Sequence, residues 1–445
     1  MSLPVEKVLR KAQSLMKAGE LAEAEELYKQ VLSKFPKNKK AIQGYQKLKA
    51  GITSKGASSS VPPQGQVDEL VGLYNQRQFE EVLAKIKPLV SLFPKAITLH
   101  NIQGASNAAL QRYDAAIDSY KQAIKIKPDY AEAYYNLSFP DLLQGSLEEG
   151  FKLYEWRSRK KKRIVAPARA NFIWDGKQSL NSKRFVAYEE QGLGDTIQFC
   201  RYLPLLEQKG ADVTFKVKPV LHTLLQTMSS NASFSTSHPE EPEIDFETPL
   251  MSLPNLLNTS LETIPATNPY LYADHDRSKA WGERFSKDRF KIGICWQGSK
   301  TKVDFGRSFP LSLFEGISKT PNVELISLHK GEGEDQIANI DFDVTTLGPD
   351  FDAGPDAFVD TAAVMMNCDL IITSDTAVAH LAGALGCQTW VALKHIPDWR
   401  WMLNRSDCPW YPTMTLYRQK NRGDWADVFY AIKHDLSLLI DQKGQ

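Results

Sequence analysis

A 34-residue period in the N-terminal part of the chain is the feature that most constrains its fold. Pro94 and Pro128 are 34 residues apart, and the same spacing relates Phe79 to Tyr113 and Tyr113 to Leu147. A period of this length is typical of stacked helical hairpins, each of which buries its apolar face against its neighbour. The sequence therefore predicts an α-helical solenoid here.

The repeats resemble tetratricopeptide repeats. Residues 111–123 match the second helix of such a repeat, and residues 131–137 match the first helix of the next one. An earlier unit with a similar pattern extends from Ala12 to Pro36. We expect the array to bind a peptide or protein, although a helical spacer without a ligand would have the same period.

The repeat pattern is interrupted in places. Pro88 and Pro140 fall inside expected helices, where each should break or kink the helix. Residues 51–66 are rich in Gly, Ser and Pro, which predicts a flexible linker. We therefore expect a tetratricopeptide-like unit at residues 1–50, this linker, and the main array at residues 67–165. Whether the first unit stacks on the main array stays open.

Beyond about residue 166 the pattern changes to short apolar strands that alternate with helices, as in an α/β protein. A first α/β domain is expected at residues 166–275 and a second at residues 285–445. Strands are predicted at Arg184–Tyr188, Asp212–Val217, Lys291–Trp296, Leu325–Leu328, Leu370–Thr373 and Thr389–Leu393, and helices at Asp195–Gln208 and about Asp424–Ile440. An interface between two such domains is a favoured place for a ligand.

The segment Leu370–Gly386 (LIITSDTAVAHLAGALG) predicts a buried strand, a polar turn and a helix. Ser374, Asp375 and Thr376 supply side chains suited to an N-cap, and His380 shares a helix face with Thr376 four residues earlier. In an open α/β sheet, phosphate-bearing ligands bind where the carboxyl end of a strand meets a helix N-terminus. A hydroxyl, a carboxylate and an imidazole thus gather where a nucleotide diphosphate could bind.

A second motif, YEEQGLGDTIQFCRYLP, occupies residues 188–204. Gly192 and Gly194 allow a tight turn and a close backbone approach, and Asp195 is expected at the start of the following helix. Asp195 could act as an ordinary N-cap or in chemistry, and the residues alone do not decide between the two. Neither a full dinucleotide fingerprint nor a P-loop is present.

Charge and cysteine content exclude several classes of function. A net charge of +1 offers no electrostatic case for nucleic acid as the main partner. The basic run at residues 157–163 suits a solvated helix end, with contact to anionic lipid or nucleic acid as the alternative. The five cysteines lack metal-ligand spacing, so we expect reduced thiols and no metal site. The N-terminus does not resemble a signal peptide and no apolar run could span a membrane, which predicts a cytoplasmic protein.

Three segments together resemble a known family: the QGLGDTIQF turn, the SDTAVAHLAGALG turn and helix, and DWRWMLNRSDCPWYPT at residues 398–413. The family comprises bacterial tetratricopeptide-repeat proteins with a C-terminal heptosyltransferase-like domain of glycosyltransferase family 9. The likeness covers nearly the whole chain, most strongly residues 184–210 and 291–420. It implies a GT-B fold, in which two Rossmann-like domains follow the solenoid and the second holds most of the nucleotide-sugar donor.

The resemblance also implies roles for individual residues. Some relatives modify flagellin, and the layout is similar to that of protein O-linked N-acetylglucosamine transferases, although the turn motifs favour the heptosyltransferase side. The proposed catalytic base of the family matches Asp195. Donor contacts match Asp375, Thr376 and His380, and a diphosphate contact matches Arg307, with Lys300 and Lys302 nearby. Weaker candidates are Lys330, Arg400 and Arg405; the Trp399–Arg400–Trp401 patch either stacks a nucleobase or forms a packing corner.

The sequence thus predicts an inverting, metal-independent glycosyltransferase of the hexosyl or heptosyl type. It would move a sugar from a nucleotide-sugar co-substrate, without a cofactor, to a hydroxyl of a protein recruited by the repeats. Two alternatives stay open: an adaptor with a catalytically silent transferase-like domain, and a transferase that acts on an envelope glycan. The sugar, nucleotide, acceptor and oligomeric state are not named by the sequence. The mechanism demands that Asp195 and the Asp375–His380 turn face one another.

Overall fold

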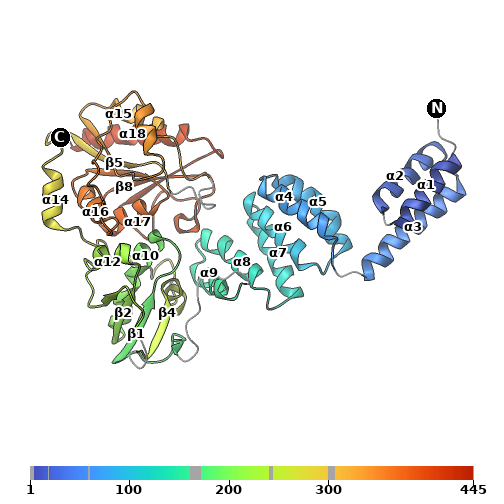
Figure 1. Ribbon diagram of the computed structural model, residues 1–445, viewed down its shortest axis with the longest axis horizontal. Helices are drawn as coiled ribbons and strands as arrows, with labels where there is room; N and C mark the ends of the chain where they lie inside the picture. The colour runs from blue at the N-terminus through green and yellow to red at the C-terminus, as the bar shows by residue number, and fades with distance from the viewer. Residues whose placement is uncertain are drawn as a thin grey trace. The chain divides into compact units, whose positions relative to one another are not determined.

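The computed structural model describes residues 5–18, 20–58, 61–160, 172–239, 244–298 and 306–443. The chain divides into two compact units, Met1–Ala133 and Tyr134–Gln445 (Figure 1). The first unit is helical and the second holds two parallel sheets, which confirms the predicted fold class of a helical solenoid followed by two α/β domains.

The first unit is built from antiparallel helical hairpins. Its helices are α1 (Val5–Ala18), α2 (Leu21–Lys34), α3 (Lys39–Ser58), α4 (Gln64–Asn75), α5 (Phe79–Leu92), α6 (Ile97–Ala109) and α7 (Tyr113–Ile126). Small residues let neighbouring helices approach closely: a Cβ on Gly104 of α6 would lie only 2.6 Å from the ring of Tyr120 on α7. One core of this unit contains Leu9, Ala12, Ala24, Tyr28, Val31, Ala41 and Leu48, and another contains Val67, Leu70, Val82, Ile86, Ala96, Leu99 and Ile102.

Two expectations about this helical region are corrected by the structure. Pro88 lies within α5 and Pro140 within α8 (Ala131–Leu143), and neither ends its helix. Each proline removes one backbone hydrogen bond, but the buried neighbours Ile86 and Leu142 hold the adjacent turns by tertiary packing. The predicted linker at residues 51–66 is helical through Ser58, where α3 ends, because a helix already nucleated upstream propagates through single glycines at modest cost.

The second unit begins with the end of the helical region. The boundary between the units falls within α8, which is followed by α9 (Leu147–Tyr154) and the short 3₁₀ helix η1 (Glu155–Arg159). Phe151 of α9 is fully buried and makes edge-to-face contacts with Phe199, Trp399 and Trp410. The last helical hairpin is therefore packed into the α/β part of the chain.

Two parallel sheets form the rest of this unit. The first has the strand order β3-β2-β1-β4 and the second the order β6-β5-β7-β8-β9. The strands of the first sheet are β1 (Lys183–Tyr188), β2 (Ala211–Lys216), β3 (Ser233–Ser235) and β4 (Phe246–Pro249). Those of the second are β5 (Phe290–Cys295), β6 (Val323–Ser327), β7 (Leu370–Ser374), β8 (Thr389–Leu393) and β9 (Met414–Arg418). The six predicted strands are all present, whereas β3, β4 and β9 were not predicted.

Helices connect the strands of both sheets. Those around the first sheet are α10 (Leu193–Phe199), η3 (Cys200–Tyr202), α11 (Leu203–Gln208), α12 (Pro219–Leu225), η4 (Leu250–Ser252) and α13 (Leu253–Leu256). Those of the second part are α14 (His275–Gly282), η5 (Leu311–Phe314), α15 (Glu315–Ser318), η6 (Glu334–Asn339), α16 (Val359–Met365), α17 (Ala377–Ala384), η7 (Trp399–Trp401) and α18 (Ala426–Lys443). The helix expected over Asp195–Gln208 is divided into α10, η3 and α11. In the described part of the chain, no helix is long and apolar enough to cross a membrane.

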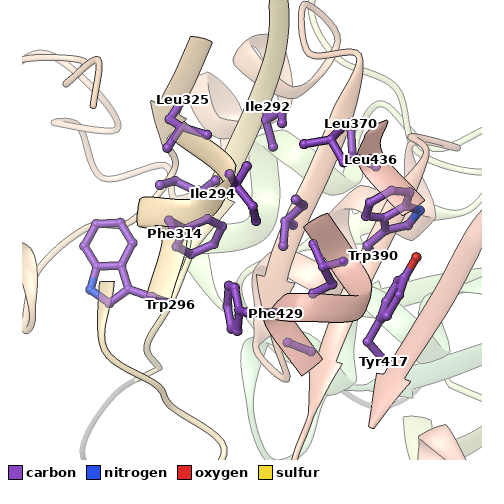
Figure 2. Packing of buried hydrophobic residues seen from close by; sticks show 14 of the residues in the cluster. Ile292, Ile294, Trp296, Phe314, Leu325, Leu370, Trp390, Tyr417, Phe429 and Leu436 are labelled. Carbon is purple, nitrogen blue, oxygen red and sulfur yellow. The ribbon is translucent and has the colours of Figure 1, made fainter. Parts of the chain in front are cut away.

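The core of the second sheet explains why its strands read as continuous apolar runs. Every residue of β6, β7 and β8 is buried, as expected for parallel strands covered on both faces. Figure 2 shows Phe429 and Leu436 of α18 packed near Ile292 and Ile294 of β5 and Leu370 of β7. This core fixes the carboxyl ends of β5 and β7, from which the polar turns emerge.

Both polar turns lie where the strand order of a sheet reverses. In the first sheet β1 lies between β2 and β4, and in the second β5 lies between β6 and β7. Ligands of open α/β sheets bind outside the carboxyl ends of the strands at such switch points. The segment after β1 carries Asp195, and the segment after β7 carries Asp375 and Thr376. The topology thus places both motifs at the positions where ligands bind in this class of fold.

Candidate functional site

The glycine turn, defined here as residues 189–194, leads from β1 into α10. Gln191 adopts a left-handed backbone conformation with a φ of 64°, and Gly192 is the N-cap of α10. Asp195 is the third residue of the helix rather than its N-cap, which corrects the expected position by less than one turn. Its Oδ2 atom accepts the backbone N–H of Gly192 at 2.8 Å, so the carboxylate closes the turn from within the helix.

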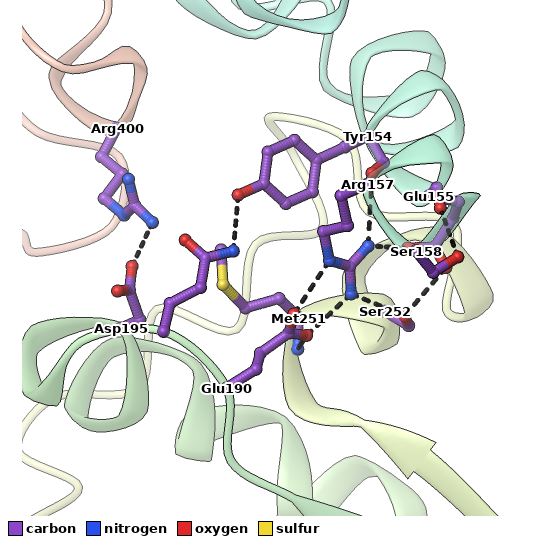
Figure 3. Close-up of polar contacts among 10 residues, drawn as sticks. Tyr154, Glu155, Arg157, Ser158, Glu190, Asp195, Met251, Ser252 and Arg400 are labelled. Carbon is purple, nitrogen blue, oxygen red and sulfur yellow. Dashed lines mark hydrogen bonds and ion pairs between the residues drawn. The ribbon is translucent and has the colours of Figure 1, made fainter. Parts of the chain in front are cut away.

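Arg400 is the charged partner of Asp195. One guanidinium nitrogen of Arg400 donates to Asp195 Oδ1, and the other donates to Asp398 Oδ1 at 2.7 Å. Asp398 in turn caps η7 by accepting the backbone N–H of Arg400 at 3.0 Å. Arg400 was only a weaker candidate from the sequence, yet it joins Asp195 in the first turn of α10 to the DWRW segment of the second domain (Figure 3).

The protonation of these groups follows from their burial. Desolvation raises the pKa of the Asp195 carboxyl, while Arg400 and the Gly192 N–H oppose that rise. Burial alone would also raise the pKa of Asp398, but the contacts with Arg400 lower it overall. The side chain of Asp195 keeps 17% of its surface exposed. Each carboxylate oxygen has a second lone pair, so Asp195 can still accept a proton from an approaching hydroxyl.

The turn after β7 gathers the expected donor-binding residues. Thr376 is the N-cap of α17, although its hydroxyl makes no capping hydrogen bond to the helix. The Ser374 hydroxyl is buried and without a hydrogen-bond partner within the described residues. Burial and the nearby Asp398 raise the pKa of Asp375 to about 6, with Trp401, Arg307 and Arg400 acting in the opposite direction.

Arg307 lies beside this turn. A Cβ built on Gly298, just beyond β5, would lie 2.8 Å from Arg307 Nη2 and 3.2 Å from Thr376 Cγ2. The absence of a side chain at Gly298 therefore lets the guanidinium come close to the start of α17. A cation next to a helix N-terminus is a suitable environment for a diphosphate. The other expected cations, Lys300 and Lys302, lie outside the described residues.

His380 is embedded in the second domain. Its Nδ1 atom and the Tyr411 hydroxyl are 3.0 Å apart, and its ring stacks on Trp401 with centroids separated by 5.2 Å. Burial, reinforced by Arg400, lowers the pKa of His380 to about 3, so the imidazole is neutral at physiological pH. A contact between His380 and a donor stays a prediction.

His380 also marks the contact between the two domains. A Cβ on Gly194 of α10 would lie 2.8 Å from His380 Cδ2 and 3.4 Å from the Cα of Ala377, at the start of α17. The helices that begin at the two polar turns therefore pack directly on each other (Figure 1). Gly194, next to Asp195, thus contacts the helix that follows the Asp375–Thr376 turn, so the two motifs lie at one junction of the domains.

The two remaining candidates make contacts elsewhere. The ammonium of Lys330 donates to the backbone carbonyls of Phe351 and Asp352. Arg405 pairs with Asp407 two residues away, through nitrogen–oxygen distances of 2.9 and 2.5 Å. Both cations are thus engaged in local contacts, and neither contact involves the Asp195–Arg400 pair.

Sequence reasoning did not identify several residues of this region. Tyr411 holds His380, and Arg201 bridges the domains: its guanidinium donates to the Tyr270 hydroxyl at 2.9 Å and to the backbone carbonyl of Trp410 at 2.5 Å. Asp398 could have been found, because Asp is among the residues preferred at the N-cap of a helix. The partners of Arg201 are far away in sequence, so no local signal pointed to them. Among the described residues, no group of three or more His, Cys, Asp or Glu is arranged to hold a metal ion.

Comparisons with known proteins agree with this architecture. Residues 9–41 and 106–139 match families described as "Tetratricopeptide repeat" and "TPR repeat". The chain is 24% identical over 419 residues to protein FlbA of Caulobacter vibrioides, an alignment that covers 78% of this chain and 68% of that protein.

Among solved structures, the chain is similar to a family 9 glycosyl transferase from Veillonella parvula, with a TM-score of 0.43, 12% identity, and coverage of 60% of this chain and 99% of that one. It is also similar to the E. coli ADP-heptose lps heptosyltransferase II, with a TM-score of 0.38, 11% identity, and coverage of 59% and 100%. The chain thus carries tetratricopeptide repeats ahead of two parallel α/β domains, the order of parts predicted from its sequence.

Proposed function

We propose that this chain is an inverting glycosyltransferase that moves a sugar from a nucleotide-sugar donor to a hydroxyl of a protein bound by its repeats. One observation carries the proposal: Asp195 of the first domain and the turn after β7 of the second lie at one junction, where Gly194 contacts the α17 helix. Both segments follow strands at switch points of their sheets. In this proposal a base and a turn suited to a diphosphate would lie within reach of one bound pair of substrates.

In this proposal Asp195 is the general base. It would take the proton of the acceptor hydroxyl as that oxygen attacks the anomeric carbon from the face opposite the departing diphosphate. Burial raises the pKa of the Asp195 carboxyl, which makes it a stronger proton acceptor than an exposed aspartate. Arg400 keeps the carboxylate oriented through its bond to Oδ1, leaving a lone pair on each oxygen for the hydroxyl.

The second domain would stabilise the leaving group. As the bond to the sugar breaks, negative charge develops on the nucleoside diphosphate, and fixed positive groups lower the energy of that state. Arg307 and the N-terminal N–H groups of α17 are the candidates, because both border Thr376. With these groups stabilising the diphosphate, the proposed reaction needs no metal ion and no cofactor. The identity of the nucleotide stays open.

A second candidate function is supported by the contacts of Asp195. The carboxylate caps its own helix turn and pairs with a buried arginine, which are the contacts of a structural residue as well as of a base. A chain that retained this network for stability alone would be a repeat adaptor with a silent α/β domain.

The substitution Asp195→Asn separates the two candidates. For the enzyme, transfer should fall by about a hundred- to ten-thousand-fold, while binding of the donor persists. The matched control is Asp212→Asn, because Asp212 is an exposed aspartate in the same domain. A screen of nucleotide sugars by thermal shift should first identify a donor. Absence of a thermal shift with every nucleotide sugar tested would favour the adaptor.

The acceptor can be tested independently. Mass spectrometry of host proteins with and without this gene should reveal a modified protein if the acceptor is a protein. Loss of an envelope glycan, with all proteins unchanged, would instead favour the glycan-directed transferase.

A further inference from the structure

A buried ion pair connects the end of the helical region to the glycine turn. Arg157 of η1 and Glu190 are each 1% exposed at their side chains. Arg157 Nε donates to Glu190 Oε2 at 2.9 Å, and Arg157 Nη2 donates to Glu190 Oε1 at 2.7 Å. This two-point contact fixes the orientation of both groups, since a guanidinium and a carboxylate are planar and match in geometry.

The pair is enclosed by further hydrogen bonds. Glu190 Oε1 also accepts the backbone N–H of Met251 at 2.9 Å. Arg157 donates to the Ser252 hydroxyl at 2.9 Å and to Glu155 Oε1 at 2.7 Å, and Ser252 donates to Glu155 Oε2 at 2.8 Å (Figure 3). The buried charges are therefore satisfied as one network that spans η1, the glycine turn and η4.

A second contact holds the residue that gives the turn its shape. Gln191 has a left-handed backbone, which is unfavourable for a residue with a side chain. The side-chain Nε2 atom of Gln191 donates to the Tyr154 hydroxyl at 2.8 Å, and the backbone carbonyl of Gln191 accepts from the Lys218 ammonium at 2.8 Å. Tyr154 belongs to the last turn of α9, so the helical region directly supports this backbone conformation.

We infer that α9 and η1 fix the position of the glycine turn, with Tyr154 and Arg157 acting as positioning residues for Asp195. Figure 3 shows the Arg157–Glu190 pair in the right half of the view and the Arg400–Asp195 pair at the left. Glu190 and Gln191 are held by the helical region, while Asp195, a few residues later, reaches Arg400 of the second domain. The last repeat hairpin is thus a working part of the candidate site rather than a separate binding module. The consequence for catalysis rests on the proposed function, whereas the positional role does not.

The test is hydrogen–deuterium exchange on the full chain, following the amides of residues 189–199 with residues 370–385 as the internal reference. Tyr154→Phe removes the hydrogen bond from Gln191, together with the one that Tyr135 shares with the same hydroxyl, and keeps the buried ring. Exchange over residues 189–199 should therefore rise about fivefold while the reference is unchanged. Arg157→Gln should raise the exchange rate over residues 189–199 further. The matched control is Arg159→Gln, since Arg159 is an exposed cation of the same 3₁₀ helix and should leave both segments at the wild-type rate.

The inference is overturned if Tyr154→Phe folds normally and its glycine turn exchanges at the wild-type rate. Should Arg157→Gln fail to fold, Tyr154→Phe alone decides the question. Once a donor is known, Tyr154→Phe should lower kcat and leave the KM of the donor unchanged. A faster-exchanging turn in a protein without any transferase activity would support the positional role and refute the proposed function, so the two failures are distinguishable.

Discussion

The substitution Gly194→Ala tests the close packing of α10 on α17. The new Cβ would lie 2.8 Å from His380 Cδ2, closer than real side chains pack, and 3.4 Å from the Cα of Ala377. His380 cannot easily move, because Tyr411 holds its Nδ1 atom and Trp401 stacks on its ring. We therefore expect an overpacking penalty in the upper part of the usual range, about 2–3 kcal/mol.

Part of this penalty is offset within the helix. Alanine is favoured over glycine in a helix by up to about 1 kcal/mol, which leaves a net loss of about 1–2 kcal/mol. For a unit the size of Tyr134–Gln445, this corresponds to a decrease of roughly 1.5–3 °C in melting temperature. Scanning calorimetry of the full chain measures it. The transition of the second unit should shift, and that of the first should not.

The matched control is Gly65→Ala. Gly65 is the second residue of α4, as Gly194 is of α10, and no atom lies within 4 Å of the place that its new Cβ would take. The Gly65→Ala chain should melt at or slightly above the wild-type temperature. In a double-mutant cycle with His380→Ala, the Gly194→Ala penalty should disappear, giving a coupling energy of about 2 kcal/mol. A Gly194→Ala chain that melts at or above the wild-type temperature would show that α10 and α17 do not meet as described.

Three further predictions concern pH, chain length and donor binding. Burial lowers the pKa of His380 to about 3 from its ordinary 6.5, so the unfolded chain binds a proton that the folded chain excludes as the pH falls through this window. Acidification from pH 7 to 5 should therefore lower the free energy of unfolding of the wild-type chain by about 2 kcal/mol through His380. The difference in unfolding free energy between wild type and His380→Asn should narrow by the same amount. A difference that stays constant would contradict the lowered pKa of His380. Removal of residues 1–127 leaves α8, α9 and η1 in place and should preserve cooperative melting of the second unit. Removal of residues 1–165 deletes the buried Phe151 ring and the Arg157 partner of Glu190, a loss of about 3–5 kcal/mol from the aromatic ring alone; equal melting of the two truncated chains would refute this. For any nucleotide sugar found to bind, Arg307→Gln should weaken affinity by about 10- to 100-fold in calorimetric titration, while Arg405→Gln, which breaks only a local pair, should not.

Local patterns predicted much of the fold. The 34-residue period indicated helical hairpins, and the six expected strands are all present. Those at the centre of the second sheet were recognisable because a strand covered on both faces must be apolar throughout. The strands β3, β4 and β9 were missed since they are short or half-polar segments at the edges of their sheets. The helix-breaking effect of Pro88 and Pro140 was overestimated, because intrinsic propensity is a weaker influence than tertiary packing.

For the candidate site, the sequence by itself determined which polar turns follow buried strands, because strand, turn and helix signals are local. It could not show that Asp195 pairs with Arg400, that Tyr411 holds His380, or that Arg157 anchors Glu190. These partners are separated by 31 to 205 residues, and the nature of a side chain does not reveal which distant group will satisfy it. Only the tertiary structure decided that. Burial removes water from these charged and polar groups, so each must find a protein partner, and the packing of the domains supplies it.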